Sequence, residues 1–242
     1  MGPYSELRSS GSVIRYDRSV LDPFEPRLFD VAWIQDQGHH RGNAAGRGAA
    51  HFLSFAGHEM VLRPLLRGGL VRKISRDLYL RTQLERTRAI QEFSLLGWMW
   101  ARDLPVPRPV AAQMCPHGLF YCAALITLRI PNAQPLEDMI CQYALDEGQW
   151  AKVGGAVRAI HDAGVYHSDL NRRNILIDSS GDVWLIDFDK CERRVPGAWT
   201  NENLDRLLRS LRKNDPEGRP LRWSKADWQA LLDGYAQGAP AR

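Results

Sequence analysis

Residues 167–178 of this chain read HSDLNRRNILID, and residues 184–189 read WLIDFD. The apolar runs predict short strands over 174–178 and 183–186, and the run Ser179-Ser180-Gly181-Asp182 between them predicts a turn. A hairpin of this length brings the two residues at its open end, Asn174 and Asp187, side by side.

Three oxygen-bearing side chains in this stretch predict a phosphoryl-transfer site. Asp169 supplies a carboxylate that can orient an attacking hydroxyl, and Asn174 and Asp187 supply hard oxygen ligands of the kind that Mg²⁺ prefers. Any one of them alone would be an ordinary turn residue at the end of a strand. All three at this spacing, in this strand context, favour the functional interpretation.

The composition is that of an ordinary globular protein. The chain has 242 residues, of which 44% are hydrophobic, enough for one large domain or a two-lobed unit with a substantial core. No secretory signal is recognisable, and the longest apolar run, 121–128, is too short to span a bilayer, so we expect a soluble or peripheral protein. The cysteines form no Cys-x-x-Cys pair, which favours reduced thiols, and Cys115 and Cys122 flank a predicted turn that would place them near each other.

Basic residues gather in two segments, and the net charge is +4. The first runs from Arg63 to Arg88. The second, at helical spacing, consists of Arg206, Arg209, Arg212 and Lys213. Such segments attract polyanions, namely nucleic acid, phosphorylated lipid or the anionic face of a membrane. A merely solvated basic face is the alternative.

The remaining patterns predict an α+β chain. Residues 1–28 lack periodicity and are interpreted as a loose N-terminal lead-in. The predicted strands are 51–55, 58–63, 110–114 and 119–130, and the predicted helices are 84–101, 136–143, 147–163, 201–213 and 224–236. Residues 131–135 are the best candidate boundary, because strands precede them and helices follow.

Three features of the strand-rich part suit phosphate binding. The turn around Gly46 and Gly48 would let backbone N–H groups approach phosphate oxygens, although a plain hairpin loop explains the same glycines. Arg63 ends a strand with a cation suited to a phosphate or a carboxylate. Glu92 lies in the helix at 84–101, where it either pairs with Arg63 or lies on a solvated face.

This order of parts resembles the protein-kinase-like superfamily, and within it the bacterial 3-deoxy-D-manno-octulosonic acid (Kdo) kinases, relatives of the lipopolysaccharide core heptose kinases. The motifs that carry the resemblance are Gly46-Arg47-Gly48, Val61-Leu62-Arg63, Arg67-Gly68-Gly69-Leu70, Thr87-Arg88, Glu92-Phe93, Leu104-Pro105-Val106-Pro107, His167-Ser168-Asp169-Leu170-Asn171 and Ile186-Asp187-Phe188-Asp189-Lys190-Cys191. The resemblance runs from Phe29 to Tyr235. It implies a bilobal fold, with an N-lobe of antiparallel sheet and one helix at 29–130 and a mainly helical C-lobe at 131–242.

For the predicted hairpin, the resemblance implies a role for each residue. Asp169 would be the base or orienter for the acceptor hydroxyl. Asn174 and Asp187 would be the ligands of Mg²⁺. His167 would be architectural, packing beneath the metal-binding turn.

For the N-lobe, the resemblance implies that Gly46 and Gly48 cover the phosphates of ATP. Glu92 would position Arg63, which stands where most of the superfamily has a lysine. Asp189 stands where protein kinases have the glycine of Asp-Phe-Gly. Both replacements suit the lipopolysaccharide-kinase branch.

The implied cofactors are ATP and Mg²⁺, and the implied acceptor is a Kdo-bearing lipid A precursor. No long activation segment follows Asp187, which favours a small or lipid-borne acceptor over a peptide. The basic segments fit such an acceptor, because it carries carboxylates and phosphates. We therefore expect peripheral binding to the anionic cytoplasmic face of the bacterial inner membrane, and no nucleic-acid partner.

Two other interpretations stay open. One is a kinase of another acceptor, such as a heptose, an aminoglycoside or a choline-type alcohol, although a basic surface would not favour a cationic acceptor. The other is a non-catalytic, kinase-shaped module that binds RNA or anionic lipid. The intact set of Asp169, Asn174 and Asp187 argues against the second.

Overall fold

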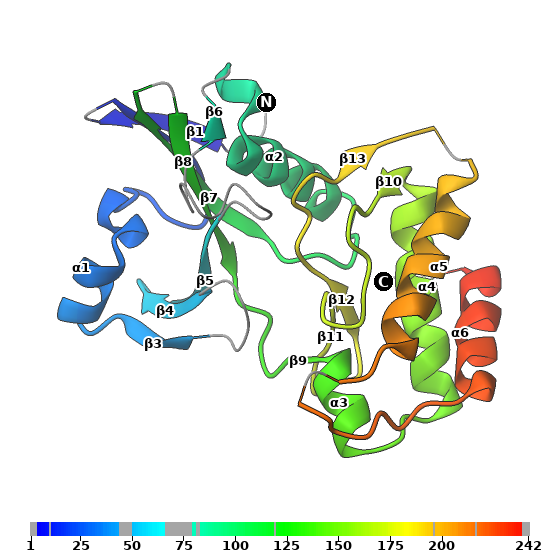
Figure 1. Ribbon diagram of the computed structural model, residues 1–242. Helices are drawn as coiled ribbons and strands as arrows, with labels where there is room; N and C mark the ends of the chain where they lie inside the picture. The colour runs from blue at the N-terminus through cyan, green and yellow to red at the C-terminus, as the bar shows by residue number, and fades with distance from the viewer. Residues whose placement is uncertain are drawn as a thin grey trace. The chain divides into compact units, whose positions relative to one another are not determined.

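The computed structural model describes residues 4–9, 11–43, 50–65, 79–80, 83–118, 120–195, 197–215 and 217–238. Contacts divide the chain into two compact units (Figure 1). Unit 1 comprises residues 1–97 and 108–129, and unit 2 comprises residues 98–107 and 130–242.

Unit 1 is built on an antiparallel sheet. Its strands are β1 (Tyr4–Ser9), β2 (Ser12–Asp17), β3 (His40–Asn43), β4 (His51–Phe55), β5 (His58–Pro64), β6 (Tyr79–Leu80), β7 (Pro109–His117) and β8 (Phe120–Leu128). They pair in the order β1-β2-β7-β8-β5-β4-β3, and β6 pairs with β8. The short helices η1 (Pro26–Phe29), α1 (Val31–Asp36) and η3 (Leu84–Arg86) and the longer α2 (Arg88–Trp100) accompany the sheet. Inward side chains such as Ile14, Leu53, Met60 and Ile126 form its core, as expected where one face of each strand is buried.

The interpretation of residues 1–28 as a loose lead-in needs correction. Strands β1 and β2 form a hairpin, and β2 pairs with β7, with Val13 opposite Met114. The sequence hides β2 because Val13 and Ile14 are buried in succession, so the alternation typical of a strand is lost. Its last residue, Asp17, is a buried carboxylate that accepts hydrogen bonds from Arg108.

Unit 2 is mainly helical. Its elements are β9 (Gln134–Pro135), α3 (Leu136–Gln142), α4 (Glu147–Asp162), β10 (Val165–Tyr166), β11 (Ile175–Ile177), β12 (Val183–Leu185), β13 (Glu192–Arg193), α5 (Trp199–Arg212) and α6 (Lys225–Gln237). The four helices predicted from periodicity are confirmed, with their ends moved by a residue or two. Side-chain caps set two of the starts: Asp146 accepts from Gln149 N–H at α4, and Ser224 and Asp227 form a capping box at α6.

The α+β class and the kinase-like distribution of strands and helices between the two units are confirmed. An antiparallel sheet with one long helix forms the first unit, and helices dominate the second. Cys115 and Cys122 are direct partners across β7 and β8, as their positions around the turn predicted. Both are free thiols.

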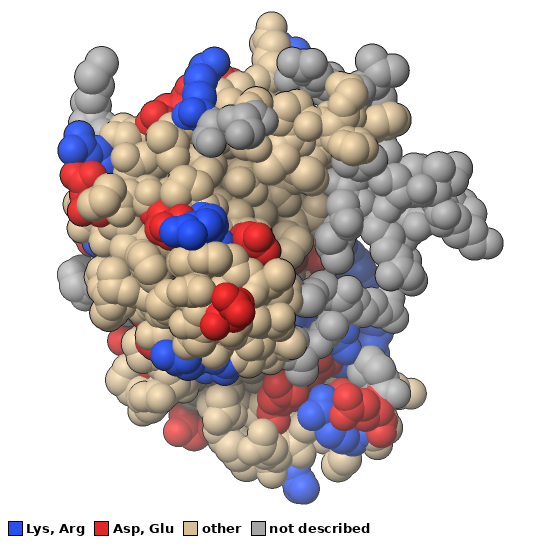
Figure 2. All heavy atoms as spheres, turned by 90° about the vertical axis from the view of Figure 1, so that its left-hand side faces the viewer, with Lys and Arg blue, Asp and Glu red and all other residues tan. Residues whose placement is uncertain are grey.

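The surface of the described residues carries mixed charge. On the face drawn in Figure 2, basic and acidic side chains lie beside each other in small groups, separated by uncharged residues. Ion pairs such as Arg18–Asp22 and Arg27–Glu25 are of this kind. Most of the basic segment from Arg63 to Arg88 lies outside the described residues, so a basic patch there stays a prediction. None of the helices in the described ranges has the length and apolar character needed to span a bilayer.

Helices α4 and α6 lie side by side in unit 2 (Figure 1) and touch through glycines. A methyl group added at Gly154 would lie 1.9 Å from the carbonyl oxygen of Leu231, and one added at Gly234 would lie 2.1 Å from that of Ala151. Both contacts are with backbone, which cannot rotate away. The two helices therefore pack at a distance that only glycine permits.

Gly154→Ala should lower the free energy of unfolding by at least about 1–3 kcal/mol, because the helices must separate to admit the methyl group. Gly148→Ala is a matched control in the same helix, since Gly148 is exposed and an added Cβ meets only the Asp146 side chain, at 3.4 Å. The control should be neutral or stabilising by up to about 1 kcal/mol. Urea unfolding measures both, and equal stability of the two variants would contradict the packing argument.

Candidate active site

The β11–β12 hairpin places Asn174 and Asp187 as the sequence predicted. Ile175 pairs with Leu185, and the carbonyl of Asn174 accepts the N–H of Ile186 at 3.0 Å. Asn174 therefore lies opposite Ile186, and Asp187 is the next residue along, so both stand at the open end of the hairpin. The Asn174 amide donates through Nδ2 to the Asp169 carbonyl at 2.9 Å, which leaves Oδ1 as the end of the amide suited to a metal ion.

Asp169 is held by its backbone and exposed at its carboxylate. Its carbonyl accepts from the side chains of both Asn171 and Asn174, each at 2.9 Å. Its N–H donates to Nδ1 of His167 at 3.2 Å. These hydrogen bonds fix the backbone of Asp169. Its side chain is 59% exposed, so the carboxylate is accessible to an acceptor.

Asp187 has an unusual backbone conformation. Its φ of 66° lies in the left-handed region, which a residue with a side chain adopts at a cost of about 1–3 kcal/mol. The next residue, Phe188, is 1% exposed, and its ring lies 4.8 Å from that of His167. Such strain persists where neighbouring packing fixes it, and it clusters at functional sites.

His167 is fully buried and links the two halves of the motif. Its Nε2 lies 3.1 Å from the Ile186 carbonyl, so this nitrogen carries the proton, and Nδ1 accepts from the Asp169 N–H. Burial lowers the pKa of His167 and keeps the ring neutral. Both ring nitrogens are engaged within the protein, which supports the architectural role implied for this histidine.

Asn203, on α5, is a site residue that sequence reasoning missed. Its Oδ1 accepts the N–H of His167, and its Nδ2 donates to the carbonyl of His167, both at 3.0 Å. Oδ1 also lies 3.3 Å from Nε2 of His161, so that nitrogen is protonated and Nδ1 of His161 accepts from the Tyr235 hydroxyl at 2.9 Å. The segment 167–174, which carries Asp169 and leads into β11, is called the active-site loop below. The buried Asn203 amide anchors the backbone at the start of this loop.

Arg172 is the second anchor that the sequence did not reveal. Its guanidinium, 5% exposed, pairs with the buried Glu137 of α3 at 2.8 Å. It also donates to the carbonyls of Ser210 and Lys213 at the end of α5, which have no partner within the helix. The middle of the loop is therefore tied to two helices at once.

In unit 1, Arg63 and Glu92 form the predicted ion pair. Nη2 of Arg63, on β5, contacts Oε1 of Glu92, on α2. The Glu92 side chain is 1% exposed and that of Arg63 is 25% exposed, so the solvated-face alternative for Glu92 is wrong. Gly46 and Gly48 lie outside the described residues, and their role stays a prediction.

The residues at the hairpin fit a magnesium ion bound together with a nucleotide. Among the described residues, no cluster of three or more His, Cys, Asp or Glu side chains could form an all-protein metal site. Mg²⁺ usually keeps several waters and binds one or two protein oxygens plus substrate phosphates. Asp187 and Asn174 supply that kind of donor.

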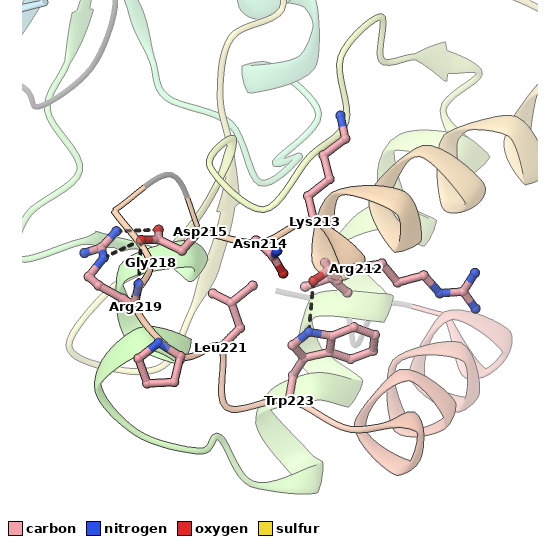
Figure 3. A pocket seen from close by; sticks show the side chains of 10 residues that line it. Arg212, Lys213, Asn214, Asp215, Gly218, Arg219, Leu221 and Trp223 are labelled. Atoms are coloured by element: carbon pink, nitrogen blue, oxygen red, sulfur yellow. Dashed lines mark hydrogen bonds and ion pairs between the residues drawn. The ribbon is translucent and has the colours of Figure 1, made fainter.

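A separate open pocket of about 580 Å³ follows the end of α5 (Figure 3). In its wall, Asp215 pairs with Arg219 at 2.9 Å, and the Trp223 indole donates to the Leu211 carbonyl at 3.0 Å. Asp215 also accepts the N–H of Glu217. These contacts hold the turn between α5 and α6 together, and we assign them a structural role.

An antiparallel sheet with one long helix, followed by a mainly helical unit with an Asp–Asn–Asp loop, is the arrangement of a protein-kinase-like phosphotransferase. A sequence model of the lipopolysaccharide kinase (Kdo/WaaP) family matches residues 31–235. The chain belongs to this family.

Curated relatives are similar over nearly their whole length. The 3-deoxy-D-manno-octulosonic acid kinase of Vibrio parahaemolyticus is 40% identical over 96% of this chain and 97% of the relative. That of Photobacterium profundum is 40% identical over 95% and 97%. That of Xanthomonas euvesicatoria pv. vesicatoria is 40% identical over 88% and 85%.

Asn203→Ala should lower both the free energy of unfolding and phosphoryl transfer. It leaves buried backbone groups of His167 without partners, at about 1–3 kcal/mol each, and frees the loop that carries Asp169. Asn201→Ala, at an exposed position on the same helix, is the matched control and should change neither. Unfolding and transfer assays on the two variants test this, and native stability of Asn203→Ala would exclude the anchoring role.

Stability should fall between pH 7.5 and pH 5 in part through His161. Burial lowers the pKa of His161 to about 4, whereas an unfolded histidine titrates near 6.5. As the pH falls, the unfolded state therefore binds the proton first. The free energy of unfolding is lower by about 2 kcal/mol at pH 5 than at pH 7.5 for this reason. In His161→Gln, urea unfolding at the two pH values should show a loss smaller by about that amount; an unchanged pH dependence would contradict the assignment.

Proposed function

We propose that this chain transfers the γ-phosphate of ATP to a hydroxyl of Kdo on a lipid A precursor, during assembly of the inner core of lipopolysaccharide. The observation that carries the proposal is the loop in which Asn174 and Asp187 share the open end of one hairpin while Asn174 also holds Asp169. The names of the curated relatives supply the acceptor.

In the proposed reaction, Asp169 accepts a hydrogen bond from the acceptor hydroxyl and orients its oxygen toward the γ-phosphorus. The new oxygen–phosphorus bond forms as the bond between the γ-phosphorus and the β–γ bridging oxygen breaks, and ADP leaves with the bond's electron pair. Asp169 takes up the hydroxyl proton. Because phosphoryl transfer depends mostly on positioning and on charge stabilisation, the hydrogen bonds that hold the Asp169 backbone contribute by positioning its carboxylate.

Asn174 and Asp187 would hold Mg²⁺, which when bound neutralises charge on the phosphates of ATP. Arg63, positioned by Glu92, would pair with the phosphates, and Gly46 and Gly48 would cover them. Because the acceptor is a lipid with anionic groups, the enzyme would work peripherally at the cytoplasmic face of the inner membrane.

The experiment that tests the function is transfer from labelled ATP, with magnesium, to a Kdo-bearing lipid A precursor and to the same precursor without Kdo. Labelling of the Kdo-bearing lipid alone is expected. Labelling of neither lipid by a protein that binds ATP would overturn the acceptor, and a failure to bind ATP would favour a non-catalytic module.

Asp169→Asn should lower turnover by about 10²- to 10⁴-fold, the usual effect of losing a positioned base. Fold and ATP affinity should stay native, because the backbone contacts that hold the loop remain. Asp205→Asn, an exposed acid on α5, is the control and should turn over normally. Native turnover of Asp169→Asn would exclude its role as base.

Asp187→Ala should weaken ATP binding in the presence of magnesium, because the proposed carboxylate ligand is lost. Without magnesium, the affinity of the variant and the native protein should be equal. Calorimetric titration of ATP with and without the ion measures both. Equal affinity in the presence of magnesium would contradict the ligand assignment.

A further inference from the structure

Arg206 brings a cation beside the carboxylate of Asp169. Its Nη1 lies 3.4 Å from Oδ1 of Asp169, beyond the usual range for a hydrogen bond between nitrogen and oxygen. The two side chains are 42% and 59% exposed. A molecule that approaches Asp169 from solvent can therefore reach both groups.

The base of the Arg206 side chain is fixed relative to the loop. Arg206 follows Asn203 by three residues on α5, and the buried Asn203 amide is bonded to the loop backbone. Leu204 and Leu207, on either side of Arg206 in the sequence, are buried. The helix thus holds the arginine in place, while the guanidinium keeps the freedom of a half-exposed side chain.

The two arginines of the loop itself, Arg172 and Arg173, form ion pairs with another residue. Arg172 and Arg173 both pair with Glu137, and Arg172 also binds carbonyls at the end of α5. Among the residues that the structure describes, Arg206 is the basic side chain with a recorded ion pair to Asp169. It is therefore the cation best placed to meet an acceptor there.

We propose that Arg206 recognises the carboxylate of the sugar acid that this enzyme phosphorylates, and so selects an acidic acceptor over a neutral sugar. The inference rests on the proposed function, in which the acceptor is an octulosonic acid. Such an acid is ionised at neutral pH. A guanidinium presents a planar fork of donors that matches a carboxylate.

The recognition works by exchange of partners. Without acceptor, Arg206 lies against Asp169 and competes for the oxygen that the acceptor hydroxyl must reach. An arriving carboxylate takes the guanidinium and leaves the Asp169 oxygen to the hydroxyl. A neutral sugar offers no such replacement, so Arg206 stays on Asp169 and the hydroxyl binds poorly.

The test compares two acceptors, the Kdo-bearing lipid A precursor and the same lipid with the Kdo carboxylate converted to a neutral carboxamide. We expect native kcat/KM to be about 10- to 100-fold higher for the acid, the effect of one charge-assisted pair. Arg206→Ala should lose this preference, mostly through a higher KM for the acid, with a native KM for ATP. Its kcat/KM on the carboxamide should be native or higher, because no arginine then competes for the Asp169 oxygen. Arg206→Lys should retain part of the preference.

Lys225→Ala, which removes one positive charge at an exposed position on α6, is the matched control and should behave as the native enzyme. An Arg206→Ala enzyme that still prefers the acid by the native factor would overturn the proposal. So would an equal loss on both acceptors, because that pattern assigns Arg206 to holding Asp169 rather than to binding the carboxylate. A native enzyme that uses both lipids equally would refute carboxylate recognition alone, whereas one that uses neither would refute the proposed function as well.

Discussion

The active-site loop depends on one buried amide. Asn203 bonds the N–H and the carbonyl of His167 from a helix that lies 36 residues further along the chain. Both backbone groups are otherwise shut away from water, and unsatisfied groups of this kind are costly. The His167 ring then extends the fixed geometry to Asp169 and to Ile186. The start of the loop is thereby positioned by one side chain.

A buried ion pair holds the middle of the loop. Arg172 and Glu137 form a buried ion pair, and removal of one partner from such a pair is strongly destabilising even where the pair itself adds little. Arg172 also satisfies carbonyls at the end of α5. Between the two ties, Asp169 is held by its backbone while its carboxylate faces solvent. Rigidity at the base and access at the tip are what a positioned base requires.

The sequence predicted the parts of the site that are local. The hairpin follows from two apolar runs and a turn, and the pairing of Arg63 with Glu92 follows from one charged residue at a strand end and another in the next long helix. Asn203 and Arg172 could not be found in this way, since an amide in a polar helix and an arginine in a basic run both resemble solvated residues. Only the fold shows that each meets a partner 35 or more residues away. Strand β2 was missed for a related reason: its buried side chains do not alternate, and its buried carboxylate is paired far along the chain.

Helix α5 also sets the spacing between the residue that anchors the loop and the cation beside Asp169. Asn203 holds the loop and Arg206 reaches its carboxylate, and the three-residue interval between them turns the helix through most of one revolution, so both side chains point to the same side. One residue inserted between them would rotate Arg206 by about 100° and leave the anchor in place. The same rotation would turn the buried Leu207 and Leu211 away from the core, so the insertion would lower stability as well as move the cation off the loop. Within this helix, spacing is therefore as constrained as residue identity, because the anchor, the cation and the core residues must all keep their faces of the helix.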